Sequence, residues 1–186
     1  FKFTSDMSVE DAQKLAENLG LQHSVIPIGD IYDSFNKGLE KEFKGKEKDI
    51  TEENLQSRCR GVILMALSNK SGDLVLTTGN KSETAVGYST LYGDTAGGFG
   101  VLKDVPKTMV YELSRYRNTI SKVIPERIIE RPPTAELAPD QKDTDSLPDY
   151  DILDKIIELY VEQDKSKEEI ESLGVGNDVI ERVLRL

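Results

Sequence analysis

The chain has 186 residues, of which 37% are hydrophobic, and a formal net charge of −10 from 24 Lys and Arg against 34 Asp and Glu. This length suits one domain with its own core, the acidic balance disfavours a broad nucleic-acid-binding surface, and no apolar run approaches the roughly 18 residues of a membrane span. The single cysteine, Cys59, excludes an internal disulfide, and no signal-peptide pattern opens the chain, so the composition suits the cytoplasm.

The first part of the chain predicts helices separated by a short strand. Ser8 with Asp11 resembles a capping box, and apolar residues at helical spacing then predict a helix as far as Gly20. Residues 25–28 form an apolar run rich in β-branched side chains, which is typical of a buried strand. Apolar residues at helical spacing over 31–43 predict a second helix.

A third helix and a second strand are predicted next. Thr51 is the expected N-cap of a helix that has two glutamates in its first turn and runs through Leu67. A turn at 71–73 leads to residues 74–78, which read as a buried strand ending at Gly79. Helices that alternate with short apolar strands predict an α/β fold, in which a parallel sheet is flanked by helices and ligands bind beyond the carboxyl ends of the strands.

The second half predicts a site, a loop and a helical tail. Residues 78–107 lie where the strand-end rule places a ligand, and Asp104 is expected to cap a helix entered by Pro106. Four prolines and several acidic residues over 131–149 predict a long loop, which we expect to be mobile, functional or both. Residues 150–186 predict two or three helices, whose stripe of apolar and tyrosine side chains suits core or dimer packing.

Several motifs, taken in order, carry a resemblance to a known family. They are Asn54-Leu-Gln-Ser-Arg58-Cys-Arg60, Leu76-Thr-Thr-Gly-Asn-Lys-Ser-Glu83, Tyr92-Gly-Asp-Thr-Ala-Gly-Gly-Phe99, Lys103-Asp-Val-Pro-Lys107, Pro125-Glu-Arg-Ile-Ile129, Pro132-Pro-Thr-Ala-Glu-Leu137 and Pro139-Asp-Gln-Lys-Asp-Thr-Asp-Ser-Leu-Pro148. In this order and spacing they resemble the synthetase domain of NAD synthetases, which belong to the ATP-pyrophosphatase superfamily with a Rossmann-like fold of the adenine nucleotide alpha hydrolase type. The resemblance covers nearly the whole chain, residues 1–186.

The resemblance implies a two-step ligase reaction with ATP and Mg²⁺. ATP adenylates the nicotinate carboxylate of deamido-NAD and releases pyrophosphate, and ammonia then displaces AMP to give NAD. Lysines and magnesium have to screen phosphate charge while water is kept from the adenylate. Family members form homodimers, so self-association is expected here.

The resemblance also assigns roles to single residues. Thr78, Lys107 and Thr134 match positions that contact ATP; Asn54 and Arg58 match positions that contact deamido-NAD; Glu83 matches a glutamate that binds magnesium or the deamido-NAD pocket. Taken alone, each has a simpler interpretation, such as a turn-capping hydroxyl, a solvated polar face or a carboxylate that complements a helix dipole.

This sequence departs from the family pattern in places. Where single-domain, ammonia-using members have a lysine and an aspartate for deamido-NAD, it has Leu91 and Gly98, so those contacts do not transfer. The pattern is more like that of the glutamine-using members, which obtain ammonia from an upstream glutaminase domain. The family's Ser-Gly-Gly-x-Asp-Ser phosphate loop is expected upstream of Phe1 and a late lysine beyond Leu186, so we expect a trimmed chain that is inactive alone. Because Phe1-Lys2-Phe3 reads as the middle of a strand and helix series, we also expect a sheet that is incomplete at its N-terminal edge.

The residues leave two other functions open. One is a different amide-forming enzyme of the same superfamily, resembling GMP synthetase or asparagine synthetase. The other is a nucleotide-binding module without catalysis. His23 is expected to be an exposed or packing residue, Cys59 a half-buried structural thiol, and the acidic run 140–149 either a lid over ATP or a solvated linker.

Overall fold

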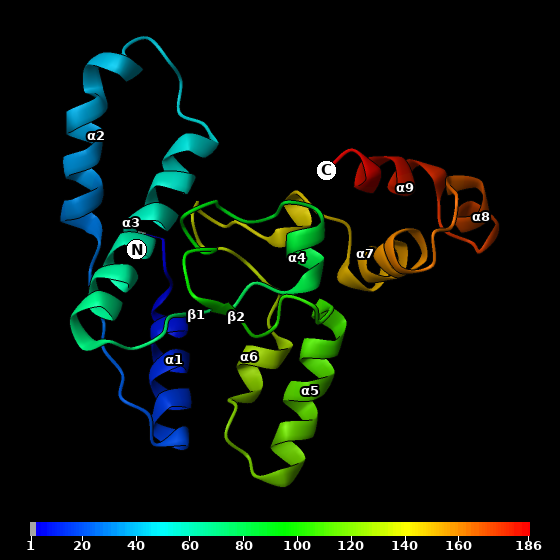
Figure 1. Cartoon of the computed structure of the whole chain (residues 1–186), viewed down its shortest axis with the longest axis horizontal. Coiled ribbons are helices and arrows are strands. Elements are labelled where there is room, and N and C mark those ends of the chain that lie inside the picture. Colours follow the sequence, from blue (N-terminus) through cyan, green and yellow to red (C-terminus); the bar gives the residue numbers. More distant parts are fainter. Residues whose placement is uncertain (1–2) are drawn as a thin grey trace.

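The computed structural model describes residues 3–186, so Phe1 and Lys2, where the sheet is expected to be incomplete, lie outside the described residues. Figure 1 shows α2 and α3 side by side, α5 and α6 below a small central sheet, and the tail helices projecting to one side. In chain order the elements are α1 Asp6–Leu19, α2 Gly29–Phe43, α3 Ile50–Ser71, β1 Leu76–Thr77, α4 Lys81–Ala85, β2 Phe99–Gly100, α5 Lys107–Ile120, α6 Glu126–Glu130, the 3₁₀ turn η1 Asp143–Asp145, α7 Tyr150–Ile157, the π turn η2 Glu158–Glu162, α8 Lys167–Ser172 and α9 Asn177–Leu184.

The first helix forms as predicted but begins earlier. The N-cap of α1 is Ser5, whose hydroxyl accepts a hydrogen bond from the backbone N of Ser8, so the predicted capping box at Ser8 and Asp11 is wrong. Asp11 instead binds the guanidinium of Arg127 at 2.8 Å. The helix ends at Gly20, which adopts the left-handed conformation with φ 66° that glycine reaches at no steric cost.

The strand predicted over 25–28 is wrong. The structure, which describes all four residues, places them outside the helices and strands, with Val25 62% and Ile26 46% exposed. Only Ile28, which precedes α2, is buried. An apolar β-branched run becomes a strand only when a neighbouring strand accepts its hydrogen bonds.

The N-cap of helix α3 lies two residues before the predicted one. Asp49 is the N-cap, since its carboxylate accepts from the backbone N of Thr51 at 2.8 Å while Glu52 accepts from the backbone N of Asp49 at 3.0 Å. Thr51 therefore lies inside the helix. At the other end Gly72 takes a left-handed φ of 81°, which confirms the predicted turn.

The sheet is parallel, as the α/β prediction requires, but small. Strands β1 and β2 pair with Leu76 opposite Phe99 and Thr77 opposite Gly100. The predicted strand over 74–78 is thus confirmed at its centre, whereas its predicted burial is wrong because Leu76 is 54% exposed. The partner β2 lies in the glycine-rich stretch, for which the sequence predicts no strand.

The expected cap of α5 is also wrong. Pro106 is the N-cap residue, and Asp104 forms an ion pair with Lys81 at 3.1 Å instead. The helix itself begins at Lys107, as the proline predicts.

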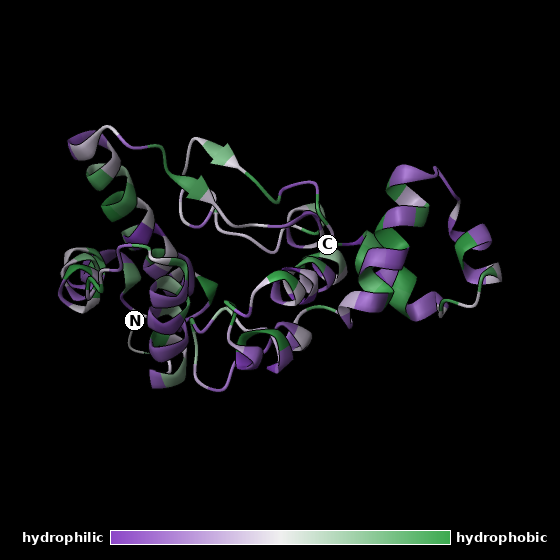
Figure 2. Cartoon of the chain, turned by 90° about the horizontal axis from the view of Figure 1, so that it is seen from below, coloured by the Kyte–Doolittle hydropathy of each residue, from purple (hydrophilic) through white to green (hydrophobic). Residues whose placement is uncertain are grey.

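The main core cluster lies in the tail. Apolar side chains on one face of α7 pack against α4, α8 and α9, and the cluster comprises Val86, Leu147, Tyr150, Leu153, Ile156, Ile157, Leu159, Ile170, Val175, Ile180 and Val183. Figure 2 shows hydrophobic (green) stretches on the helices that project to one side. The apolar stripe that begins at Tyr150 therefore serves as core. Among the described residues, no helix combines the length and apolarity needed to cross a membrane.

Candidate functional site

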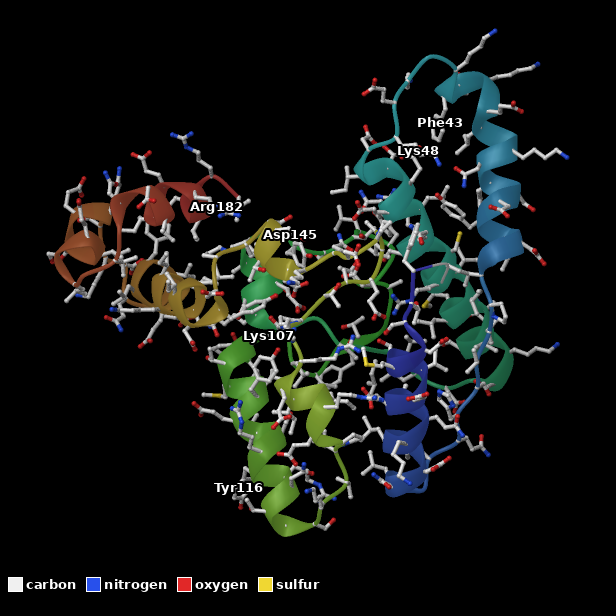
Figure 3. All side chains as sticks on the ribbon, turned by 180° about the vertical axis from the view of Figure 1, so that it is seen from behind. Phe43, Lys48, Lys107, Tyr116, Asp145 and Arg182 are labelled. Atoms are coloured by element: carbon white, nitrogen blue, oxygen red, sulfur yellow. The ribbon has the colours of Figure 1, made fainter. Side chains whose placement is uncertain are left out.

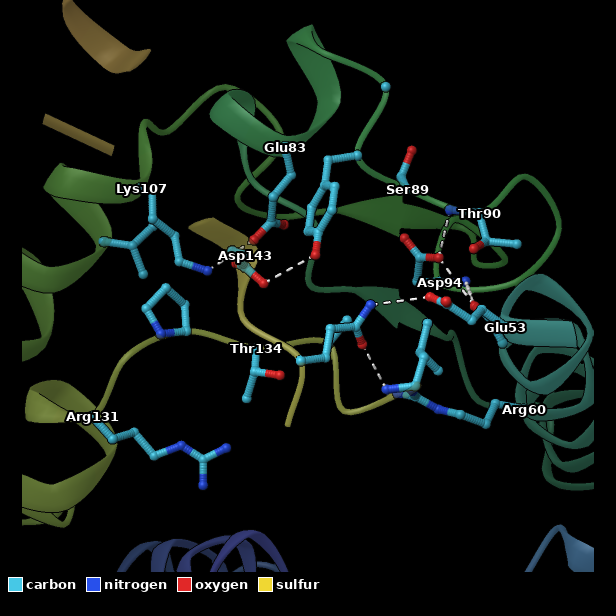
Figure 4. A pocket seen from close by; sticks show the side chains of 18 of the residues that line it. Glu53, Arg60, Glu83, Ser89, Thr90, Asp94, Lys107, Arg131, Thr134 and Asp143 are labelled. Atoms are coloured by element: carbon cyan, nitrogen blue, oxygen red, sulfur yellow. Dashed lines mark hydrogen bonds and ion pairs between the residues drawn. The ribbon is translucent and has the colours of Figure 1, made fainter. Parts of the chain in front are cut away.

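A pocket of about 540 Å³ lies where α3, α4, α5 and the segment 131–149 meet (Figure 4). Its lining combines apolar side chains with convergent polar groups, as in sites that bind small molecules. The residues are Ile50, Glu53, Asn54, Ser57, Arg60, Glu83, Gly87, Tyr88, Ser89, Thr90, Asp94, Lys107, Val110, Tyr111, Ser114, Ile128, Ile129, Arg131, Pro133, Thr134, Ala135, Leu137, Gln141 and Asp143.

An ion pair between two helices forms one wall of this pocket. The Nζ atom of Lys107, at the start of α5, lies 2.8 Å from Oε1 of Glu83 in α4, and both side chains are mostly buried, with 18% and 19% exposed. The second oxygen of Glu83 accepts from the backbone N of Asn80 at 3.3 Å, completing the capping box of α4. Glu83 is therefore held from two sides, and it holds Lys107 at the pocket wall.

A buried carboxylate connects three segments behind this pair. Asp143, which is 4% exposed, accepts hydrogen bonds from the hydroxyls of Tyr88 at 3.2 Å and Tyr150 at 2.8 Å. The ring of Tyr150 also faces Lys107, whose Nζ lies 5.2 Å from the ring centroid, a cation–π distance. Burial and the negative charge of Asp143 raise the pKa of both tyrosines, so both stay protonated and can donate.

The opposite wall is built from α3 and the turn after α4. The hydroxyl of Thr90 donates to Oδ1 of Asn54, a residue of the pocket lining, at 2.8 Å, so the NH₂ group of that amide takes no part in this bond. Asp94 accepts from the backbone N of Thr90 at 2.7 Å and from the hydroxyl of Ser57 at 3.1 Å. This wall is therefore preorganised by side-chain hydrogen bonds.

Two glycines allow the turn to pack directly on α3. A Cβ atom at Gly61 would lie 2.6 Å from the carbonyl oxygen of Tyr92, and one at Gly93 would lie 2.3 Å from Oγ of Ser57. These distances are far below van der Waals contact, so only glycine fits at either position without a shift.

The segment 131–149 forms the floor of the pocket and is tied to its surroundings. Gln141 accepts from the backbone N of Leu137 at 2.9 Å and donates to Glu53 of α3 at 3.0 Å. Thr134 Oγ1 accepts from the backbone N of Glu136, and the Glu136 carboxylate binds Arg131 at 3.3 Å. The mobility predicted for this segment stays a prediction.

Four of the six predicted site residues line this one pocket: Asn54, Glu83, Lys107 and Thr134. The other two are absent from that lining, within the residues that the structure describes. Arg58 is exposed and donates through Nε to the carbonyl oxygen of Leu91 at 3.2 Å. Thr78 is exposed just after β1.

A second, smaller pocket of about 250 Å³ lies beside Thr78. Its lining includes the two neighbours of that threonine, Thr77 and Gly79, and the glycine-rich stretch before Lys103. Glu83, together with Ser89 and Asp94, lines both pockets, so the two hollows adjoin. The arrangement suits one extended ligand or two ligands that meet beside Glu83.

The charged side chains of the larger pocket limit how a magnesium ion could be held there. Its lining contains four carboxylates and three cationic side chains, so it offers no surplus of positive charge to a polyphosphate. Within residues 3–186 no group of three His, Cys, Asp or Glu side chains is placed to hold a metal ion. Mg²⁺ commonly takes only one or two protein carboxylates and completes its shell with phosphate oxygens and water. Glu83 fits that limited role.

The sequence alone predicts no role for several residues of the site, among them Asp143, Tyr88, Thr90, Asp94 and Gln141. Asp94, Gln141 and Asp143 lie inside the motifs that carry the family resemblance, and that is the signal the sequence offers for them. Each also has a partner more than 30 positions away in the sequence, and no local pattern reveals those hydrogen bonds.

His23 matches one of the two expectations for it, whereas Cys59 is fully buried and not half-buried as expected. His23 is exposed. Cys59 is a free thiol with 1% exposure, and burial raises its pKa, the opposite of what a reactive thiolate requires.

Comparison with known proteins gives consistent matches. A sequence model of the family described as NAD synthase matches residues 1–186. The glutamine-dependent NAD(+) synthetase of Acinetobacter baylyi is 56% identical over 188 residues, covering 100% of this chain and 35% of that protein. That of Thermotoga maritima is 57% identical over 180 residues, covering 96% of this chain and 31% of that protein. The chain thus spans about a third of the length of these curated relatives.

Solved structures show the same fold. The glutamine-dependent NAD+ synthetase of Acinetobacter baumannii, in complex with ADP, superposes with a TM-score of 0.69 at 49% identity, over 98% of this chain and 32% of that one. The NMN synthetase of Francisella tularensis superposes with a TM-score of 0.80 at 25% identity, over 98% of this chain and 68% of that one.

Proposed function

The chain belongs to the NAD synthase family, and on this premise we propose that it forms the ATP- and deamido-NAD-facing part of a glutamine-dependent NAD synthetase. One observation carries the proposal. Four residues matched by the family resemblance, from four separate segments, line a single pocket in which Lys107 and Glu83 are paired. High identity to relatives named glutamine-dependent NAD(+) synthetase supports the same function.

The proposed reaction has two balanced steps. An oxygen of the nicotinate carboxylate attacks the α-phosphorus of ATP, and the bond to the β-phosphate oxygen breaks, which releases pyrophosphate. The nitrogen of ammonia then attacks the acyl carbon of the adenylate, loses a proton, and displaces AMP as the carbon–oxygen bond breaks. The products are NAD, AMP and pyrophosphate.

The pocket residues have complementary roles in this proposal. The ammonium of Lys107 neutralises phosphate charge in a partly dehydrated site, where such an interaction is stronger than in water. The hydroxyl of Thr134 contacts ATP from the floor, and Thr78 contacts it from the end of β1 beside the smaller pocket. The amide of Asn54 donates to deamido-NAD, and Arg58 contacts the same substrate from the outer face of α3.

Magnesium has a limited place in the proposal. Glu83 would hold Mg²⁺ together with phosphate oxygens, and the ion supplies positive charge that screens the polyphosphate. The balance of charges in the lining, four carboxylates against three cations, supports the need for such an ion.

The ammonia, the assembly and the compartment are also proposals. We propose that ammonia comes from glutamine, as the names of the relatives suggest, and that the protein is a cytoplasmic homodimer. Sedimentation that shows only a monomer at micromolar concentration would contradict the dimer.

A second candidate is amidation of a different carboxylate by the same chemistry. The superposition on an NMN synthetase makes a mononucleotide the nearest alternative, and xanthylate or aspartate would be the substrates of the other superfamily enzymes considered above.

The test is a substrate panel on the complete protein that contains these residues. We expect deamido-NAD, with ATP, magnesium and glutamine or ammonia, to yield NAD and AMP in equal amounts. With nicotinate mononucleotide, xanthylate or aspartate in place of deamido-NAD, we expect little release of pyrophosphate from ATP. Preferred turnover of any of these three would replace the proposed substrate, and ATP binding without turnover of any would favour a non-catalytic module.

A further inference from the structure

Helix α5 begins at the pocket lysine without a cap from its own sequence. The first N–H groups of a helix need acceptors from outside it, and Pro106, the N-cap residue, has no polar side chain. The backbone N of Lys107 donates to the hydroxyl of Ser82 at 2.8 Å, and the backbone N of Thr108 donates to Oδ2 of Asp154 at 2.9 Å. Two other helices, α4 and α7, therefore cap α5.

Asp154 is the centre of this junction. Besides the Thr108 backbone, its Oδ2 accepts from the Thr108 hydroxyl at 2.8 Å, and its Oδ1 accepts from the hydroxyl of Ser82. Ser82 is 1% exposed, so its hydroxyl depends on the backbone N of Lys107 and on Asp154 for its hydrogen bonds. The carboxylate also puts negative charge at the positive end of the α5 dipole.

Helix α7 also contacts the ammonium end of Lys107, through the ring of Tyr150. Tyr150 lies four residues before Asp154 and so on the same face of α7. Its ring faces the Lys107 ammonium at 5.2 Å, while Asp154 and Ser82 fix the backbone from which that side chain extends. Figure 3 shows Lys107 at the junction between the central part and the tail.

We propose that Asp154 is a positioning residue for Lys107: it caps α5 from the tail and so sets where the lysine ammonium meets the phosphates of ATP. This inference rests on the proposed function only in taking ATP as the ligand of Lys107. Asp154 is absent from the lining of the larger pocket, within the described residues, so its effect passes through α5.

The first test compares Michaelis constants in the complete protein. Asp154→Ala should raise the KM for ATP about 5- to 10-fold, the change that corresponds to loss of a helix cap, and should leave the KM for deamido-NAD unchanged. Asp154→Asn retains one acceptor and should give a smaller rise. Asp151→Ala, at an exposed acidic residue of the same helix, is the matched control and should change neither constant.

A purely stabilising role would give a different pattern. Fewer folded molecules lower kcat in proportion and leave both KM values at the wild-type level, and that outcome in both Asp154 variants would overturn the proposal. Hydrogen exchange of the amides at 107–108 checks the cap without turnover: both should exchange faster in Asp154→Asn, and unchanged exchange would contradict the capping role.

A double-mutant cycle tests whether Asp154 acts through the lysine. In a Lys107→Ala background, Asp154→Ala should cause no further loss of ATP affinity, measured by calorimetry if turnover is too slow. Additive losses would overturn the proposal. If Lys107→Ala alone leaves ATP affinity unchanged, the proposed function of the pocket fails, whereas a loss in Lys107→Ala with none in Asp154→Ala rejects only the positioning role.

Discussion

The ammonium of Lys107 lies 2.8 Å from the carboxylate of Glu83, although the two residues begin different helices and lie 24 positions apart. Both side chains are mostly withdrawn from water, so each depends on the other for charge compensation. A phosphate that enters the pocket would compete with Glu83 for the lysine.

Removing that ammonium should weaken ATP binding. We expect Lys107→Ala to raise the KM for ATP about 10- to 100-fold, the range of one lost hydrogen bond to a charged group. Lys122→Ala, at an exposed lysine that pairs with Glu126 at 3.5 Å, is the control and should leave the KM at the wild-type value. Equal KM values in the two variants would remove Lys107 from the ATP site.

The hydrogen bond from Thr90 should orient the Asn54 amide. Thr90→Val keeps the shape of a residue that is 6% exposed but removes the donor to Oδ1 of Asn54. The side-chain amide of Asn54 is then free to rotate. We expect the KM for deamido-NAD to rise about 5- to 10-fold, since a hydrogen bond contributes about 1 kcal/mol, and the KM for ATP to stay unchanged. Thr119→Val, at an exposed position on α5, is the control. A rise in the KM for ATP alone would show that Asn54 contacts ATP and not deamido-NAD.

The hydroxyl of Tyr150 should contribute to stability. Tyr150→Phe removes the 2.8 Å hydrogen bond to the buried Asp143 carboxylate and keeps the ring over Lys107. We expect the free energy of unfolding to fall by about 1.5–3 kcal/mol. Urea denaturation measures this change, and Tyr116→Phe, at a residue that is 65% exposed, should give no change.

The same tyrosines predict a stability limit in alkali. Burial and Asp143 raise the pKa of Tyr88 and Tyr150 above the ordinary value, so the folded protein keeps protons that the unfolded chain loses near pH 10. Stability should therefore be unaffected by these groups below about pH 10 and should fall as pH rises beyond it. The decline should be shallower in Tyr150→Phe, and parallel declines in both proteins would contradict the assignment.

The thiol of Cys59 should be inert while the protein is folded. The residue is 1% exposed and burial raises its pKa, so the reactive thiolate is scarce and inaccessible. We expect no reaction with Ellman's reagent in buffer and complete reaction of this thiol in denaturant. In the complete protein, mass spectrometry of the labelled peptide separates it from other cysteines. Fast labelling of the native protein would mean that this part of α3 opens.

The close approach at Gly61 should not tolerate a methyl group. Gly61→Ala places a Cβ 2.6 Å from the Tyr92 carbonyl oxygen, and overpacking of this kind costs about 1–3 kcal/mol of stability. Gly38→Ala is the matched control, because it also lies within a helix but has nothing within 4 Å of the added atom. We expect that variant to be stabilised by about 0.5–1 kcal/mol. A neutral Gly61→Ala would show that the turn moves freely away from α3.

The sequence predicted most helices, because apolar spacing and a glycine stop such as Gly20 or Gly72 are local signals. Caps were less accurate. The pattern favours residues three positions after Ser5 and two after Asp49, because several polar side chains near a helix start can act as the cap until the backbone direction is known. The run 25–28 has strand composition, but composition does not supply a hydrogen-bonding partner.

The site was only partly predictable for a related reason. The family resemblance points to Lys107 and Glu83, and the structure places their side chains in contact, while their roles stay predictions. Asp143 and Asp154 lie behind this pair, and each binds a side chain more than 50 positions away, Tyr88 and Ser82 respectively. No spacing rule relates an aspartate to such distant partners.

The capping of α5 by Asp154 has a consequence for how the protein is made. Everything before Tyr150 leaves the ribosome first, so the first turn of α5 emerges with its N–H groups facing only water and Ser82. We infer that the pocket lysine takes its final position late in synthesis, when α7 emerges and docks.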